Sequence, residues 1–78
     1  MARVRYFAAA EEAAGVSEET RSERSLDELR SGLREDYPGL AAILPRCAVL
    51  VSGSRHEDPA TPLGDDTIVD VLPPFAGG

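Results

Sequence analysis

Apolar and polar residues alternate near both ends of the chain. In Arg3–Phe7, Val4 and Tyr6 lie on one face, and Thr67–Leu72 repeats the pattern with two valines on one face. A period of two is typical of a strand that buries one side against a core. We therefore predict a strand at each of these segments.

The middle of the chain carries the pattern of an amphipathic helix. Ser25 and Glu28 form a capping-box sequence, in which a serine and a glutamate three residues later bond each other's free backbone amides. Large apolar residues then recur at helical spacing, at Leu26, Leu29, Leu33 and Tyr37. We predict the main helix at Leu26–Asp36 and expect Pro38-Gly39 to end it.

Local composition assigns the other segments. Ala8–Ala14 is rich in alanine and glutamate and is followed by Gly15, so we predict a short helix there. The apolar run Cys47–Val51 fits a central strand. We also predict a strand at or near a sheet edge within Val16–Arg24 and a helical turn at Leu40–Leu44. Ser52-Gly53 is predicted to be a turn and Ser54–Asp66 a loop. Strands wrapped over one main helix indicate an α+β roll.

The alternation also directs two large apolar side chains away from the core. If Val4 and Tyr6 point inward, Phe7 points outward, and inward-facing valines in the last strand leave Leu72 outward. The two residues are neighbours only if the first and last strands lie side by side. An exposed apolar pair beside the chain end would indicate a docking surface. Parity alone leaves the alternative open that either residue is ordinary core or is covered by a loop.

Size and charge narrow the class of protein. Seventy-eight residues form a single domain, 1–78, with no room for a deep catalytic pocket in addition to a core. The net charge of −6 argues against nucleic acid and anionic membranes as partners. No apolar run approaches the ~18 residues of a membrane span, and the N-terminus lacks the apolar core of a signal peptide. The single cysteine cannot form an internal disulfide, which agrees with a reducing compartment. We therefore expect a cytoplasmic protein.

The sequence ends in a distinctive tail. Leu72 is followed by Pro73, Pro74, Phe75, Ala76, Gly77 and Gly78. Proline favours extended backbone at its own position and the one before it, whereas glycine allows close approach to the backbone. We predict that residues 73–78 form an extended, flexible tail whose last four residues reach about 13 Å. Two glycines alone would be a frayed end, but the complete string favours a tail that presents the Gly78 carboxylate inside a narrow channel of another protein.

Other reactive side chains lack the neighbours that chemistry requires. Cys47 begins an apolar run with no base at readable spacing, which favours a structural role. His56 stands alone in a charged loop, without partners for metal binding or acid–base catalysis. Asp65-Asp66 is predicted to be a turn, and pairing with arginines of a partner enzyme is the alternative. We expect no permanently bound cofactor and no metal.

Three motifs together resemble a known family. They are the aromatic strand Val4–Phe7 with the alanine- and glutamate-rich helix after it, the capped helix from Ser25, and the tail Leu72–Gly78. The whole chain resembles the small subunit of molybdopterin synthase, a sulfur carrier of the MoaD/ThiS type. The resemblance implies a ubiquitin-like β-grasp roll with a mixed sheet of about four to five strands packed on one main helix.

The resemblance also implies a function. An adenylating enzyme similar to ubiquitin-activating enzymes would use ATP to activate the Gly78 carboxylate, and a sulfur donor protein would lead to a Gly78 thiocarboxylate. The large subunit of molybdopterin synthase would receive the tail, in an expected heterotetramer. The thiocarboxylate would then supply sulfur to cyclic pyranopterin monophosphate in molybdenum cofactor biosynthesis. The chain would be the sulfur-donating subunit of a sulfurtransferase complex and would have no catalytic pocket of its own.

The same resemblance assigns roles to individual residues. Gly77 and Gly78 would form the reactive end, and the docking residues would be Phe7, Leu72, Pro73, Pro74, Phe75 and Ala76. Arg55 and His56 depart from the family pattern, because relatives often carry an apolar interface residue in this region. Whether Ser54–Asp58 joins the docking surface stays open. The alternative functions are a sulfur carrier for thiazole (thiamine) or cysteine biosynthesis, a ubiquitin-like protein modifier, and an interaction module with an inert tail.

Overall fold

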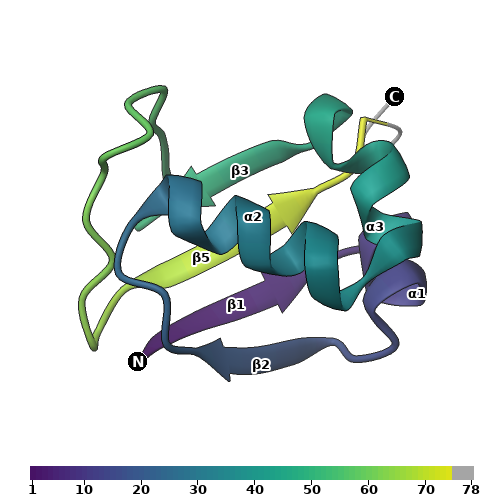
Figure 1. The fold of residues 1–78 in the computed structure, drawn as a ribbon, viewed down its shortest axis with the longest axis horizontal. Coiled ribbons are helices and arrows are strands. Elements are labelled where there is room, and N and C mark those ends of the chain that lie inside the picture. The colour runs from purple at the N-terminus through teal and green to yellow at the C-terminus, as the bar shows by residue number, and fades with distance from the viewer. Residues whose placement is uncertain (75–78) are drawn as a thin grey trace.

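A mixed five-stranded sheet forms one layer of the molecule. The structure is a computed structural model and describes residues 1–74. The strands are β1 (Ala2–Tyr6), β2 (Glu18–Arg21), β3 (Ala48–Val51), β4 (Ser54–Arg55) and β5 (Ile68–Leu72), in the spatial order β2-β1-β5-β3-β4. β1 and β5 are parallel neighbours, and the other pairs are antiparallel (Figure 1). The predicted α+β class with a mixed sheet is confirmed.

Helices cover one face of this sheet. α2 (Leu26–Asp36) crosses the face with the bounds that the apolar stripe predicts (Figure 1). α1 (Ala9–Ala14) and α3 (Pro38–Ile43) pack together near the end of the sheet where β1 and β5 finish. A 3-10 turn at Leu44–Arg46 then leads into β3. Within residues 1–74, no helix has the length and apolar character needed to cross a membrane.

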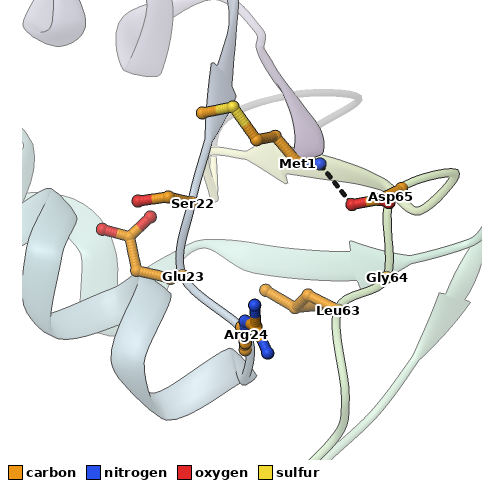
Figure 2. Close-up of a pocket in the computed structure, with 7 residues that line it drawn as sticks. All are labelled: Met1, Ser22, Glu23, Arg24, Leu63, Gly64 and Asp65. Atoms are coloured by element: carbon orange, nitrogen blue, oxygen red, sulfur yellow. Dashed lines mark hydrogen bonds and ion pairs between the residues drawn. The ribbon is translucent and has the colours of Figure 1, made fainter.

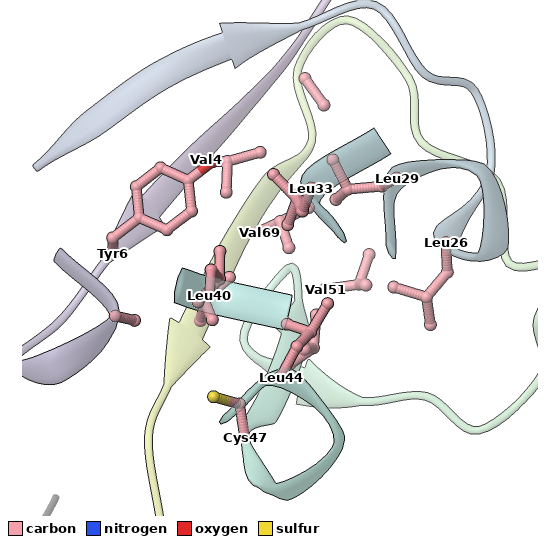
Figure 3. Packing of buried hydrophobic residues seen from close by; sticks show 14 of the residues in the cluster. Val4, Tyr6, Leu26, Leu29, Leu33, Leu40, Leu44, Cys47, Val51 and Val69 are labelled. Atoms are coloured by element: carbon pink, nitrogen blue, oxygen red, sulfur yellow. The ribbon is translucent and has the colours of Figure 1, made fainter. Parts of the chain in front are cut away.

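The core lies between α2 and the sheet, as Figure 3 shows. Leu26, Leu29 and Leu33 of α2 are buried there. The strands contribute Val4, Tyr6, Val49, Val51, Val69 and Val71, and Leu40 and Leu44 come from the segment after α2. Tyr37, the last residue of the predicted stripe, packs against this core and is partly buried. The spacing of the apolar residues therefore identified the buried face of the main helix.

The start of α2 is capped as predicted, with one difference. The Ser25 hydroxyl accepts a hydrogen bond of 3.2 Å from the Glu28 backbone N–H. The Glu28 carboxylate accepts a bond of 3.3 Å from the backbone N–H of Arg24, one residue earlier than the usual capping-box partner. Both ends of the motif thus satisfy backbone amides that the helix itself leaves free.

α2 stops before Pro38-Gly39, as predicted, and Pro38 itself begins the next helix. α2 ends at Asp36, and the following Tyr37 has φ −130° and ψ 86°, outside the helical region. Pro38 is the first residue of α3. Proline suits this position because its backbone N–H is not needed there and its φ is already close to helical. The turn expected at Leu40–Leu44 is therefore part of a longer helical segment.

The turn after β3 has a consequence that the sequence prediction missed. Ser52 and Gly53 both have positive φ, 52° and 80°, as two-residue hairpin turns require. The turn folds Ser54–Arg55 back against β3 as strand β4. The predicted loop over Ser54–Asp66 is thus corrected at its first two residues.

The edge strand β2 is held partly by a shared carboxylate. The hydroxyls of Tyr6 and Tyr37 both donate to the Glu19 carboxylate, the second at 2.7 Å. The two rings pack edge to face with their centroids 6.1 Å apart. Burial and the bond to Glu19 raise the pKa of Tyr6, so it remains a donor. β2, which lies within the predicted range Val16–Arg24, is therefore held by polar contacts to Tyr6 of β1 and to Tyr37.

A second polar contact ties β2 to α2. The Arg21 guanidinium donates hydrogen bonds of 2.7 Å to Glu23 and to Asp36 at the end of α2. The hydrogen bond from Arg21 lowers the pKa of Glu23. Charge-assisted bonds in a partly buried site contribute more than exposed ion pairs do. Arg21, the last residue of β2, therefore links this edge strand to the C-terminal end of α2.

We expect Glu23→Gln to lower the free energy of unfolding by about 1 kcal/mol at pH 7, because it weakens the bond to Arg21. The folded pKa of Glu23 lies below its unfolded value of 4.5, so this contribution is present above the unfolded pKa. It disappears as the pH falls through the folded pKa. Urea unfolding at pH 7 and at about pH 3 measures both effects. Glu12→Gln, exposed on α1, is the control and should behave like the native chain; an equal loss in both variants would contradict the prediction.

Candidate functional site

The parallel pairing of β1 and β5 brings the two outward apolar residues together. Tyr6 is paired with Val71, so Phe7 and Leu72 occupy the next positions on the neighbouring strands. The backbone N–H of Phe7 donates to the carbonyl of Val71 at 3.2 Å. The Phe7 side chain is 38% exposed and Leu72 is half-buried. The strand arrangement that would make these residues neighbours is therefore present.

A third residue extends this pair into a row. Ala48 of β3 is paired with Leu72 of β5, and Leu72 lies beside Phe7 at the end of β1. Alternate residues of these strands are buried under the helices, so the three lie on the opposite, uncovered face of the sheet. We call Phe7, Leu72 and Ala48 the apolar row. It lies at the end of the sheet where β5 leads into the tail (Figure 1).

The next row of the same face contains the charged pair Arg5 and Asp70 together with the partly buried Leu50. Arg5 donates two hydrogen bonds to the Asp70 carboxylate, one of them at 2.9 Å. Its guanidinium carbon also lies 5.9 Å from the centroid of the Phe7 ring. The bond to Asp70 raises the pKa of Arg5. This ion pair therefore limits the apolar row on one side and packs against its aromatic member.

The chain leaves the sheet beside the apolar row. Pro73 is buried and Pro74 is exposed, so only the second of these two predicted docking residues is accessible in this structure. The other predicted tail residues, Phe75, Ala76, Gly77 and Gly78, lie outside the described residues.

The remaining candidates have structural surroundings. Cys47 is 7% exposed, and its thiol donates to the carbonyl of Ile43 at 3.4 Å. Burial raises the pKa of this thiol, which makes the thiolate less available. His56 is exposed. Over residues 1–74, no three His, Cys, Asp or Glu side chains gather in a way that could hold a metal ion.

A pocket of about 400 Å³ lies at the opposite end of the sheet, near the start of β1 (Figure 2). There the Met1 ammonium forms an ion pair of 2.6 Å with Asp65, which lowers the pKa of that carboxyl. Asp65-Asp66 lies in the predicted turn, closed by a hydrogen bond of 3.1 Å from the Thr67 backbone N–H to the Gly64 carbonyl. No sequence signal joins Met1 to Asp65, because they are distant along the chain and meet only through the sheet.

The sheet order, its central parallel pair and the crossing helix define the class: the chain has a ubiquitin-like β-grasp fold. It belongs to the ThiS family, whose sequence model matches residues 4–78. No curated protein in the comparison matches the chain significantly.

Solved structures agree with this assignment. The small archaeal modifier protein 1 from Methanosarcina acetivorans superposes with a TM-score of 0.84 at 26% identity, over 99% of this chain and 95% of that one. A chain in the complex of subunits 1 and 2 of molybdopterin-converting factor from Helicobacter pylori gives 0.76 at 30% identity, over 99% and 97%. The HVO 2177 protein of Haloferax volcanii gives 0.74 at 29% identity, over 99% and 85%.

We expect Phe7→Ala to change the free energy of unfolding by less than about 1 kcal/mol, because this side chain lies on the uncovered face. The adjacent Tyr6→Ala should cost about 3–5 kcal/mol or prevent folding, because it empties a buried site and removes a donor to Glu19. Urea unfolding of the two variants measures the difference. A large loss for Phe7→Ala would show that Phe7 supports the core and is not free for docking.

Proposed function

We propose that the chain is a sulfur carrier and acts as the small subunit of a molybdopterin synthase. The observation that carries the proposal is the apolar row at the point where the chain leaves the sheet toward Gly77-Gly78. Membership of the ThiS family supports the carrier role. The 30% identity to a chain in the Helicobacter pylori complex of subunits 1 and 2 supports a large-subunit partner.

The proposed chemistry takes place on the Gly78 carboxylate. A carboxylate oxygen attacks the α-phosphorus of ATP on an adenylating enzyme, which releases pyrophosphate and forms an acyl-adenylate. A persulfide sulfur of a donor protein then attacks the acyl carbon and displaces AMP. A thiol cleaves the resulting acyl disulfide at its S–S bond, which releases the thiocarboxylate and leaves a disulfide. Adenylation is needed because a carboxylate is a poor electrophile until one oxygen becomes part of a leaving group. The thiocarboxylate then donates its sulfur to cyclic pyranopterin monophosphate in the large subunit.

The body of the protein has a positioning role in this proposal. The apolar row offers a contact that fixes the direction of the tail relative to a partner. The Arg5–Asp70 pair beside it supplies polar groups at the border of that contact. The buried Cys47 takes no part, because its thiol donates to the Ile43 carbonyl and burial raises its pKa, which makes the thiolate less available. Localisation in the cytoplasm is part of the proposal.

A protein modifier is the second candidate function. It is favoured by the similarity to the small archaeal modifier protein 1 of Methanosarcina acetivorans over almost the entire length of both chains. A modifier would use the same activated Gly78 but transfer it to an amine of another protein. Carriers for thiazole or cysteine biosynthesis would share the thiocarboxylate and differ in the protein that receives it.

Intact-mass analysis tests the carrier chemistry. After incubation with ATP, an adenylating enzyme and a sulfur source, we expect the mass to rise by the difference between one sulfur and one oxygen. Deletion of Gly78, or one residue added after it, should abolish the gain while circular dichroism shows an unchanged fold. Absence of the gain with the native tail would refute sulfur carriage. Higher-mass conjugates that contain an amide to Gly78 would instead establish the modifier function.

A binding measurement tests the docking role of the apolar row. We expect Phe7→Ala to weaken binding to the large subunit by about 30-fold, as loss of a central aromatic contact does. Ile68→Ala is the matched control, because Ile68 is also 38% exposed and lies on the same face at the other end of β5. It should change the affinity less than about twofold. Equal effects of the two variants would place the contact elsewhere.

A further inference from the structure

A cationic groove lies at the edge of the sheet between α2 and the β3–β4 hairpin. Its volume is about 250 Å³. Arg30 enters it from α2, and Arg55, His56 and Glu57 line it from β4 and the segment after it, while Val49 belongs to its apolar part. The groove shares no residue with the apolar row.

Arg30 carries a buried donor without a partner in the described part of the chain. Its Nε atom is buried and has no hydrogen-bond partner within residues 1–74. Buried donors in folded proteins nearly always have a partner, because leaving one unpaired costs stability. Arg30 also lines a smaller adjoining pocket with Glu57, so the space beside it continues along the helix. Arg30 therefore lines the groove with a guanidinium group whose inner nitrogen has no partner among residues 1–74.

The groove is also positive in an otherwise acidic protein. In the part of the chain that the structure describes, the ion pairs do not include Arg30, Arg55 or His56. Glu57 is the acidic residue that lines the groove, so the two guanidinium groups leave an excess of positive charge before His56 is counted. The whole chain has a net charge of −6. A local concentration of unpaired cations on such a protein favours an anionic ligand.

We propose that this groove binds a phosphate group. Two guanidinium groups and an imidazole offer more donors than the two oxygens of a single carboxylate can accept, whereas a tetrahedral phosphate presents an oxygen to each. The volume lies below the roughly 300 Å³ at which pockets for whole small molecules begin. The groove therefore accommodates the phosphate itself, either free or as the end group of a nucleotide. This proposal is independent of sulfur carriage.

Titration of the isotope-labelled protein with inorganic phosphate at constant ionic strength tests the site by NMR. We expect saturable shifts at Arg30, Val49 and residues 55–57. Arg30→Gln and Arg55→Gln should each weaken binding at least about tenfold, because each removes a charge-assisted donor. Arg34→Gln, at an exposed arginine one turn further along α2 that does not line the groove, is the matched control and should bind like the native chain. Glu57→Gln should tighten binding, because it removes a like charge.

Parallel titrations with AMP and ATP identify the source of the phosphate. Tighter binding than inorganic phosphate, with the same dependence on Arg30, assigns the site to a nucleotide, and weaker or equal binding assigns it to free phosphate. A linear response that is the same in Arg30→Gln, Arg55→Gln and Arg34→Gln overturns the proposal. Saturable binding of an acidic peptide without any binding of phosphate also overturns it and identifies the groove as a protein contact.

Discussion

The parallel pairing of β1 with β5 is the contact on which the rest of the molecule depends. It joins the two ends of the chain and places Val4 beside Val69 and Tyr6 beside Val71 under the helices. The same register puts Phe7 at the uncovered face. A slip by one residue would exchange the buried and exposed faces of the strand, because side chains alternate. The core and the candidate docking surface are therefore two results of one register.

The uncovered face shows how a small protein can carry apolar residues outside its core. The row next to Phe7 contains the Arg5–Asp70 pair, so charge begins one step along the strands from the apolar row. The guanidinium of Arg5 also lies over the Phe7 ring. This neighbour limits the exposed apolar area, which reduces nonspecific association, while 38% of the Phe7 side chain stays accessible.

The sequence predicted those elements whose structure depends mainly on neighbouring residues along the chain. The apolar stripe and the cap were sufficient to predict α2, because a helix forms its backbone hydrogen bonds within its own segment. The alternation of apolar and polar residues in β1 and β5 identified the buried faces of these strands. Pro38-Gly39 follows the end of α2 as expected, but the start of α3 at Pro38 was not predicted. Proline suits the first position of a helix, and only the chain direction at Tyr37 decides that a new helix begins there. The ion pair of Met1 with Asp65, and the lack of a partner for Arg30 Nε within residues 1–74, depend on tertiary neighbours, for which a single sequence has no pattern.

The small size of the apolar row constrains how a carrier of the proposed kind would work. Three side chains on an open sheet offer little buried area, and small interfaces are characteristic of transient complexes. Much of the affinity must then come from the tail. The activating enzyme and the sulfur acceptor would meet the same row, so the row cannot tell the carboxylate from the thiocarboxylate. In such a carrier, the one atom that differs at Gly78 would distinguish the two forms for partners that meet the same row.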